Sequence, residues 1–226
     1  MVGVLAVFAG VLALLSLAVG LAGVDGDAEV LADEASLLAA GADVADYIRA
    51  SFWLNMFGNY LLLVPLALLL HVLCADGRRA DAWVLTVAGG IYLLFGAAGS
   101  AIFAGAWPDL IEKYAAAGGE AERAAILADF ELVSAIAGDG LHGIVQNVAG
   151  AVWLVGIGAL MRTWVPSLGW LAMAIGAFLA ITTVGTMFGA EALNLVGVTA
   201  TVLLAPIWSI AVGLRLILTP PSALTP

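Results

Sequence analysis

The sequence is poor in charged residues, and this shortage excludes a water-soluble globule. Charged residues make up 11% of its 226 positions and hydrophobic residues 64%, and the mean hydropathy is +1.13. Soluble domains contain about 25% charged and about 45–50% apolar residues. We therefore predict an integral membrane protein whose first partner is the lipid bilayer.

Motifs for cofactors, metals and nucleic acids are also missing. The single cysteine, Cys74, excludes an internal disulfide, a cage of cysteine metal ligands and a redox cysteine pair. The sequence contains neither a phosphate loop nor an EF-hand loop. A net charge of −10 excludes nucleic-acid binding. We predict no cofactor, no metal site and no nucleic-acid partner.

The apolar stretches lack the alternation of apolar and polar residues that membrane β-strands require, so they are predicted to be helices. A hydrocarbon core about 30 Å thick takes about 20 helical residues. Windows of this length occur at residues 2–24, 52–75, 82–107, 141–161, 168–189 and 196–216. The first lacks Lys or Arg ahead of it and exceeds the usual signal-peptide core, so we expect it to be retained. The prediction is an all-α polytopic protein with six transmembrane helices in one domain, residues 1–226.

The basic residues predict the side on which each loop lies. If six spans alternate, Arg78, Arg79, Arg162 and Arg215 share one side, which the positive-inside rule makes the cytoplasm. We therefore expect a multi-pass protein of the plasma membrane with both termini cytoplasmic. The other side has three basic and fifteen acidic residues. A solvated face and weak binding of divalent cations both remain open as explanations of that acidity.

Two outer segments, 25–51 and 108–139, are too long to be turns, and we predict both to be helical. The first contains helix-favouring stretches at 32–40 and 43–50. The second is predicted to start a new helix at Pro108, because proline suits the first helical position. After Gly118 and Gly119, apolar residues recur at three- and four-residue spacing, which predicts an amphipathic helix that caps the bundle or lies on the outer leaflet. These residues are Ile126, Leu127, Phe130, Val133 and Ile136.

Short motifs resemble a bacterial six-helix membrane family described only as a domain of unknown function. One is RTWVPSLGW, from Arg162 to Trp170, ahead of an apolar helix and with Pro206 in the last span. Another is LADEASL, from Leu31 to Leu37, which is similar to that family's acidic outer helix. The resemblance implies the six-span architecture and no activity, since none is assigned to the family. The chain departs from the family in its unusually acidic outer loop.

The two histidines are predicted to lie apart. The second and fourth spans run parallel, and His71 lies about 28 Å deeper in its span than His142 does in its own, at 1.5 Å per residue. A metal or haem held by both histidines of one chain is thus excluded. His142 is either a solvated boundary residue or a base that Asp139, one turn earlier, orients.

Polar uncharged residues of four spans are predicted to form one layer in the outer half of the membrane. Lipid offers such groups no hydrogen-bond partner, so they face protein or a wet cavity. Hydrogen bonding between packed helices is the alternative to a pocket. The candidate ligand-binding residues of this layer are Asn55, Asn59, Ser100, Asp139, His142, Gln146, Asn147, Thr182 and Thr186.

Three classes of function remain open. The first is a transporter or sensor that binds a small molecule or lipid in an outward-facing polar pocket. The second is a structural or accessory subunit with membrane-protein partners. The third is an intramembrane enzyme that uses His142, but no nucleophile or metal set accompanies this residue. Enzymatic activity is therefore disfavoured, and no residue is predicted to be catalytic.

Overall fold

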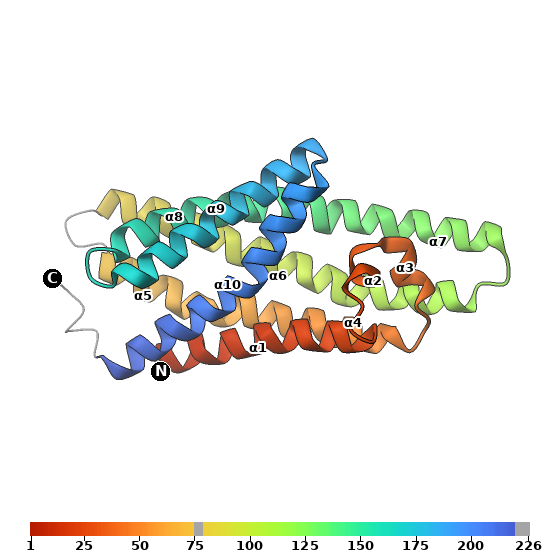
Figure 1. Ribbon diagram of the computed structural model, residues 1–226, viewed down its shortest axis with the longest axis horizontal. Helices are drawn as coiled ribbons and strands as arrows, with labels where there is room; N and C mark the ends of the chain where they lie inside the picture. The colour runs from red at the N-terminus through yellow and green to blue at the C-terminus, as the bar shows by residue number, and fades with distance from the viewer. Residues whose placement is uncertain (75–78, 220–226) are drawn as a thin grey trace.

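The computed structural model describes residues 1–74 and 79–219, and every regular element in these ranges is helical. Six helical runs in the described residues are long and apolar enough to cross a membrane, which confirms the predicted all-α polytopic fold. The runs lie roughly along one axis, and α1 begins at the end of the bundle where α10 ends (Figure 1). We call this the terminal end, and the opposite end the acidic end.

The six runs exceed the predicted windows at several boundaries. They are α1 (Val2–Gly23); α4 (Val44–Asn55), η1 (Met56–Tyr60), η2 (Leu61–Leu63) and α5 (Val64–Cys74); α6 (Arg79–Ala116); α7 (Glu120–Val133), η3 (Ser134–Gln146) and α8 (Asn147–Met161); α9 (Pro166–Phe188); and α10 (Glu191–Leu218). Two short helices, α2 (Ala28–Ala32) and α3 (Glu34–Ala39), occupy the outer segment between α1 and α4. Arg78, on which the predicted sidedness partly rests, lies outside the described residues.

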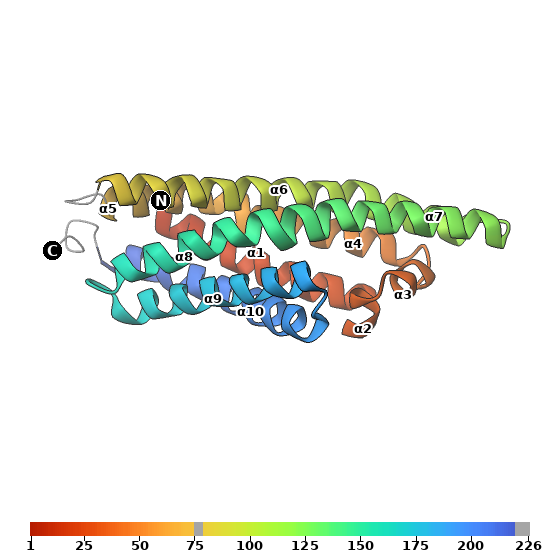
Figure 2. The same ribbon diagram turned by 90° about the horizontal axis from the view of Figure 1, so that it is seen from above.

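Helices α6 and α7 extend the third and fourth spans into a long hairpin that projects past the other helices (Figure 2). The second outer segment is therefore helical, but the predicted start at Pro108 is wrong, because Pro108 lies inside α6. A proline inside a helix removes one backbone hydrogen bond. Leu110 and Ile111 just after it are buried in an apolar cluster, and this packing offsets the loss.

That apolar cluster joins α3, α4, α6 and α7 at the acidic end. Phe130 is fully buried and stacks on Trp107 with 4.7 Å between ring centroids. Ile126 is also buried, so the predicted amphipathic helix docks through these two residues. Ile136, predicted on the same face, is 55% exposed. The π-helix η3 begins at Ser134, and its wider turn ends the α-helical register on which that prediction relied.

Helix α10 changes its packing partner along its length. In its terminal half it lies on α1, where a Cβ added to Gly10 would lie 2.6 Å from the carbonyl oxygen of Pro206 and Ser209 Oγ donates to the Ala6 carbonyl at 2.7 Å. In its acidic half it lies on α9, with Gly197 against the backbone at Phe178. Figure 1 shows α10 running obliquely, so that it meets α1 only near the terminal end. The helices therefore diverge toward the acidic end.

Candidate ligand cavity in the acidic half of the bundle

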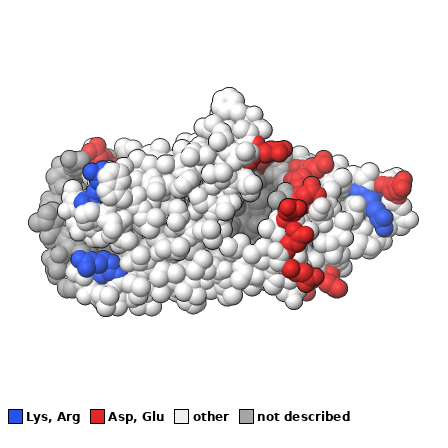
Figure 3. Space-filling view, viewed as in Figure 1, with Lys and Arg blue, Asp and Glu red and all other residues white. Residues whose placement is uncertain are grey.

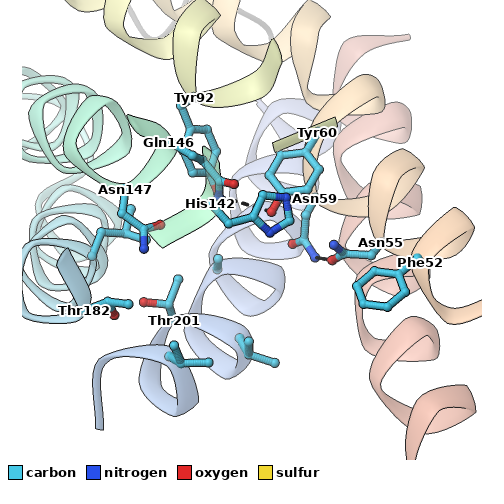
Figure 4. A pocket seen from close by; sticks show the side chains of 14 residues that line it. Phe52, Asn55, Asn59, Tyr60, Tyr92, His142, Gln146, Asn147, Thr182 and Thr201 are labelled. Atoms are coloured by element: carbon cyan, nitrogen blue, oxygen red, sulfur yellow. Dashed lines mark hydrogen bonds between the residues drawn. The ribbon is translucent and has the colours of Figure 1, made fainter. Parts of the chain in front are cut away.

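The divergence of α10 from α1 leaves a cavity of about 320 Å³ inside the acidic half of the bundle (Figure 4). Side chains from α4, η1, α6, η3, α8, α9 and α10 meet there. The residues that line it are Phe52, Asn55, Asn59, Tyr60, Tyr92, His142, Gln146, Asn147, Leu179, Thr182, Val198, Thr201, Val202 and Ala205. None of these described lining residues is charged. The volume lies at the lower end of the range for small-molecule sites, about 300–1,000 Å³.

A second hollow adjoins this cavity on the side of the acidic end. It measures about 270 Å³ and shares Phe52, Asn55, Asn59 and Val202 with the first. It extends along α1 and α4 to Gly20, Leu31 and Ile48, which lie next to the outer segment. Figure 3 shows the surface hollowed beside a band of Asp and Glu side chains. The cavity therefore borders a hollow that extends toward the acidic end of the molecule.

Two of the helices that border the cavity leave α-helical geometry beside it. Residues Met56–Tyr60 and Ser134–Gln146 are π-helical, with hydrogen bonds from residue i to i+5. In the first, the backbone breaks at Tyr60, whose φ and ψ are −131° and −72°. Such segments are rare and often occur at functional sites. Adjacent residues of a regular α-helix point about 100° apart. Here the adjacent residues Asn59 and Tyr60 both line the same cavity.

A chain of amide hydrogen bonds ties two of the spans together at the cavity wall. Asn59 Nδ2 donates to Asn55 Oδ1 at 2.6 Å, and Asn55 Nδ2 donates to Ser100 Oγ at 2.9 Å. On the other side, Gln146 Nε2 donates to the Tyr60 hydroxyl at 3.1 Å. Each of these bonds uses one of the two hydrogens of its amide nitrogen, and the amide oxygen of Asn59 lies on the cavity side (Figure 4).

Buried polar atoms of the cavity wall have no hydrogen-bond partner among the described residues. These atoms are Gln146 Oε1 and Thr201 Oγ1. Gln146 is 5% exposed, so bulk water does not reach it in this conformation. Asn147 Nδ2 donates to the Gly143 carbonyl at 3.3 Å, and its amide oxygen points into the cavity (Figure 4). The wall therefore presents amide oxygens as acceptors, together with hydroxyl and amide hydrogens that can donate.

His142 packs against α6 in the interior of the bundle and is not a solvated boundary residue. Its Nε2 lies 3.1 Å from the Gly96 carbonyl oxygen, and its ring lies 6.1 Å from the ring of Tyr60. A carbonyl only accepts, so Nε2 carries the hydrogen and Nδ1 is an acceptor in the neutral ring. Gly99 is required here, because a Cβ at that position would overlap the imidazole.

Asp139 does not join this site. It is exposed, and no hydrogen bond links it to His142 in the described structure. The two residues would share a face of a regular α-helix, but η3 adds a residue to each turn and rotates Asp139 away. His142 therefore lacks the carboxylate that one of its two predicted roles, a base oriented by Asp139, requires.

The remaining candidates divide into lining and supporting residues. Asn55, Asn59, His142, Gln146, Asn147 and Thr182 line the cavity. Ser100 lies behind the wall and accepts from Asn55, whereas Thr186 donates to the Thr182 carbonyl at 3.1 Å. Sequence reasoning missed Phe52, Tyr60, Tyr92 and Thr201. Thr201 is a polar residue in the sixth span, and this signal was present in the sequence.

The two histidines lie at different depths, as expected. His71 Nδ1 lies 2.7 Å from Thr86 Oγ1, and His142 bonds to Gly96 further along the same helix, α6. Ten helical residues separate Thr86 from Gly96, which corresponds to about 15 Å. The separation is smaller than the sequence suggested, because His142 lies deeper in the bundle than a boundary residue.

Charge is segregated along the bundle. At the terminal end, Arg162 lies over the ring of Trp170 at 4.1 Å, and Arg215 occupies the last turn of α10. At the acidic end, Arg49 is surrounded by carboxylates, with Asp46 at 2.7 Å and Asp109 at 3.4 Å. The Asp33 carboxyl accepts from Ser36, and these hydrogen bonds lower its pKa, which keeps it ionised. The mouth of the cavity thus lies at a strongly negative end.

Comparisons with protein families, curated proteins and solved structures find no match to this chain. The resemblance to a six-helix family therefore extends to the six-span architecture, and membership of that family stays a prediction.

Proposed function

We propose that the protein binds a small polar molecule in the cavity between η1, η3 and α10. The observation that carries this proposal is the pair of unpartnered buried atoms, Gln146 Oε1 and Thr201 Oγ1, on the cavity wall. Leaving such atoms unpaired costs about 1–3 kcal/mol each. Water or a bound molecule that reaches these atoms relieves that cost, whereas the packing of the described helices does not.

The cavity opens to the exterior in this proposal. Arg162 and Arg215 lie at the terminal end, and the positive-inside rule places such residues in the cytoplasm. The acidic end, with the cavity mouth, then faces outward from the plasma membrane, and both termini are cytoplasmic. A molecule reaches the site from outside through the hollow beside Gly20 and Leu31.

Neither alternative function has an observation of this kind in its favour. An accessory subunit without a ligand would pack its polar layer dry, with each amide bonded to a neighbouring helix. An enzyme built on His142 would need an orienting group, and Asp139 is exposed and unbonded to it. Binding is therefore the function that the geometry supports best.

Cysteine accessibility tests the proposal. Thr201→Cys is introduced into a Cys74→Ser background, and intact cells are treated with membrane-impermeant methanethiosulfonate reagents. We expect the cysteine at position 201 to react, since its side chain lines an open cavity. The control is Thr183→Cys, because Thr183 is buried, does not line the cavity and bonds to the Leu179 carbonyl.

Two exposed positions calibrate sidedness. Ala121→Cys on α7 should react in intact cells, and Ser167→Cys at the start of α9 should react only after permeabilisation. A cysteine at position 201 that stays as unreactive as one at position 183 would show a dry, packed layer. Reaction at position 167 in intact cells would instead reverse the orientation.

A further inference from the structure

The cavity wall offers a ligand side-chain amide oxygens as hydrogen-bond acceptors. The amide nitrogens of Asn59, Gln146 and Asn147 each use one of their two hydrogens, in bonds to Asn55, Tyr60 and the Gly143 carbonyl, respectively. The oxygens of Asn59 and Asn147 point toward the cavity (Figure 4), and that of Gln146, a residue only 5% exposed, has no partner among the described residues. A ligand that fits this wall brings hydrogen-bond donors.

Aromatic rings cover much of the remaining wall. Tyr60 and Tyr92 pack edge to face with 5.7 Å between ring centroids, and Phe52 and His142 complete the set. Aromatic faces attract cations, by about 0.5–1 kcal/mol at exposed sites and about 2 or more when desolvated. Amide oxygens and aromatic faces together are the surroundings that suit an organic cation.

No arginine or lysine is present among the described lining residues to repel a cation or to hold an anion. A phosphate or carboxylate group would find hydroxyl and amide donors there but no cationic side chain. This disfavours a phospholipid headgroup as the fitting ligand, even though the headgroup carries an amine, because its phosphate has no cationic partner among the described lining residues.

The helices that flank the route into the cavity carry exposed carboxylates. Leu31, on the wall of the connecting hollow, belongs to α2, which carries Glu29 in its first turn. Glu191 begins α10, the helix on the other side of the mouth, and both glutamates are exposed. A cleft with negative charge at its opening raises the local concentration of cations and their rate of association.

We infer that the molecule bound in the cavity is a small, soluble organic cation with N–H donors, such as a primary ammonium. This inference rests on the proposed function. The ammonium hydrogens reach the free oxygens of Gln146, Asn147 and Asn59, and the apolar part contacts the aromatic rings. It also gives the strongly acidic end a part in attracting the ligand.

The charge preference is measured with the cysteine at position 201. Its rate of reaction with a cationic reagent that carries trimethylammonium is divided by its rate with an anionic reagent that carries sulfonate. The same ratio is measured at Ala121→Cys, which lies at the acidic end but outside the cavity. We expect the ratio at position 201 to be at least ten times the ratio at 121. Val198→Cys, also on the wall, serves if Thr201→Cys does not fold.

Protection by small probes tests the ligand class directly. Benzylamine should slow the reaction at position 201 in a saturable manner, and benzyl alcohol should need at least ten times the concentration for the same effect. Benzoate should not protect. Nanodiscs with and without phosphatidylethanolamine should give equal rates, and protection by this lipid would assign the site to a headgroup and overturn the inference.

Removing negative charges near the mouth of the cavity should weaken its preference for the cationic reagent. Glu29→Gln with Glu191→Gln should lower the cationic rate at position 201 several-fold and leave the anionic rate unchanged or raised. Glu120→Gln with Asp129→Asn makes the same charge change on α7, which does not border the cavity, and should have less than a twofold effect.

The outcomes separate this inference from the proposed function. Equal relative rates with both reagents, or equal protection by the amine and the alcohol, would keep the cavity but overturn its preference for cations. No reaction of the cysteines at positions 201 and 198 with either reagent would overturn the cavity itself.

Discussion

The side-chain amide of Gln146 bonds to Tyr60 through its nitrogen and leaves its oxygen unpaired among the described residues. Its Nε2 donates to the Tyr60 hydroxyl at 3.1 Å, linking the fourth span to the second, whereas its Oε1 has no partner among the described residues. The nitrogen and the oxygen of this amide can therefore be tested separately. Tyr60→Phe removes the hydrogen bond alone, and Gln146→Leu removes both the hydrogen bond and the oxygen.

Gln146→Leu should change ligand protection more than stability. It loses one hydrogen bond, worth about 1 kcal/mol, and it also removes a buried unpaired oxygen, so the two effects nearly cancel. We expect the free energy of unfolding to change by less than about 1 kcal/mol, and protection by benzylamine to weaken at least tenfold. Tyr60→Phe is the control, because it removes the same hydrogen bond but keeps Oε1. Equal weakening in both variants would contradict the role given to the oxygen.

Asn147→Leu and Asp139→Asn should behave differently, although both residues belong to the predicted polar layer. Asn147 lines the cavity, so its substitution should weaken benzylamine protection by about tenfold, or about 1.4 kcal/mol. Asp139 is exposed, and its substitution should leave protection within twofold. A large effect of Asp139→Asn would instead support the interpretation in which Asp139 orients His142.

The crossing of α1 and α10 sets the divergence that opens the cavity, and Gly10 is essential to it. A Cβ at position 10 would lie 2.6 Å from Pro206 O, so Gly10→Ala should force the helices apart at a cost of about 1–3 kcal/mol. The control is Gly90→Ala on α6, where no atom lies within 4 Å of the added Cβ. That change should be neutral or stabilising by up to about 1 kcal/mol. Thermal unfolding of the purified protein measures both.

Docking of α7 on the bundle should depend on Phe130. Its side chain is fully buried against Trp107, so Phe130→Ala should cost about 3–5 kcal/mol of unfolding free energy. Leu132 lies two residues further and is 58% exposed, so Leu132→Ala should stay within about 0.5 kcal/mol. Similar effects of the two substitutions would show that the buried face of α7 is assigned wrongly.

Hydropathy and helical spacing were sufficient to predict the spans and much of the packing. A span length follows from membrane thickness, and six were found. Trp153 and Trp208, which lie in the middle of predicted spans, are each 2% exposed. Ile126 and Phe130 are buried on one face of α7, because the α-helical period holds as far as Val133.

The cavity could be predicted only in part, because its geometry departs from that period. Asp139 was wrongly grouped with His142, and Tyr60 was missed, since both lie in or beside π-helical turns that no spacing rule indicates. The divergence of α10 depends on the contact between Gly10 and Pro206, which are far apart in sequence. Local pattern therefore located the polar layer but not its shape.

The most direct test of the central claim is an experimental structure at a resolution that shows ordered water. The claim is that the polar layer is an open, hydrated binding cavity. We expect density for water or a bound molecule within hydrogen-bond distance of both Gln146 Oε1 and Thr201 Oγ1. A cavity closed by contact between α10 and η1, with both atoms bonded to neighbouring helices, would contradict it.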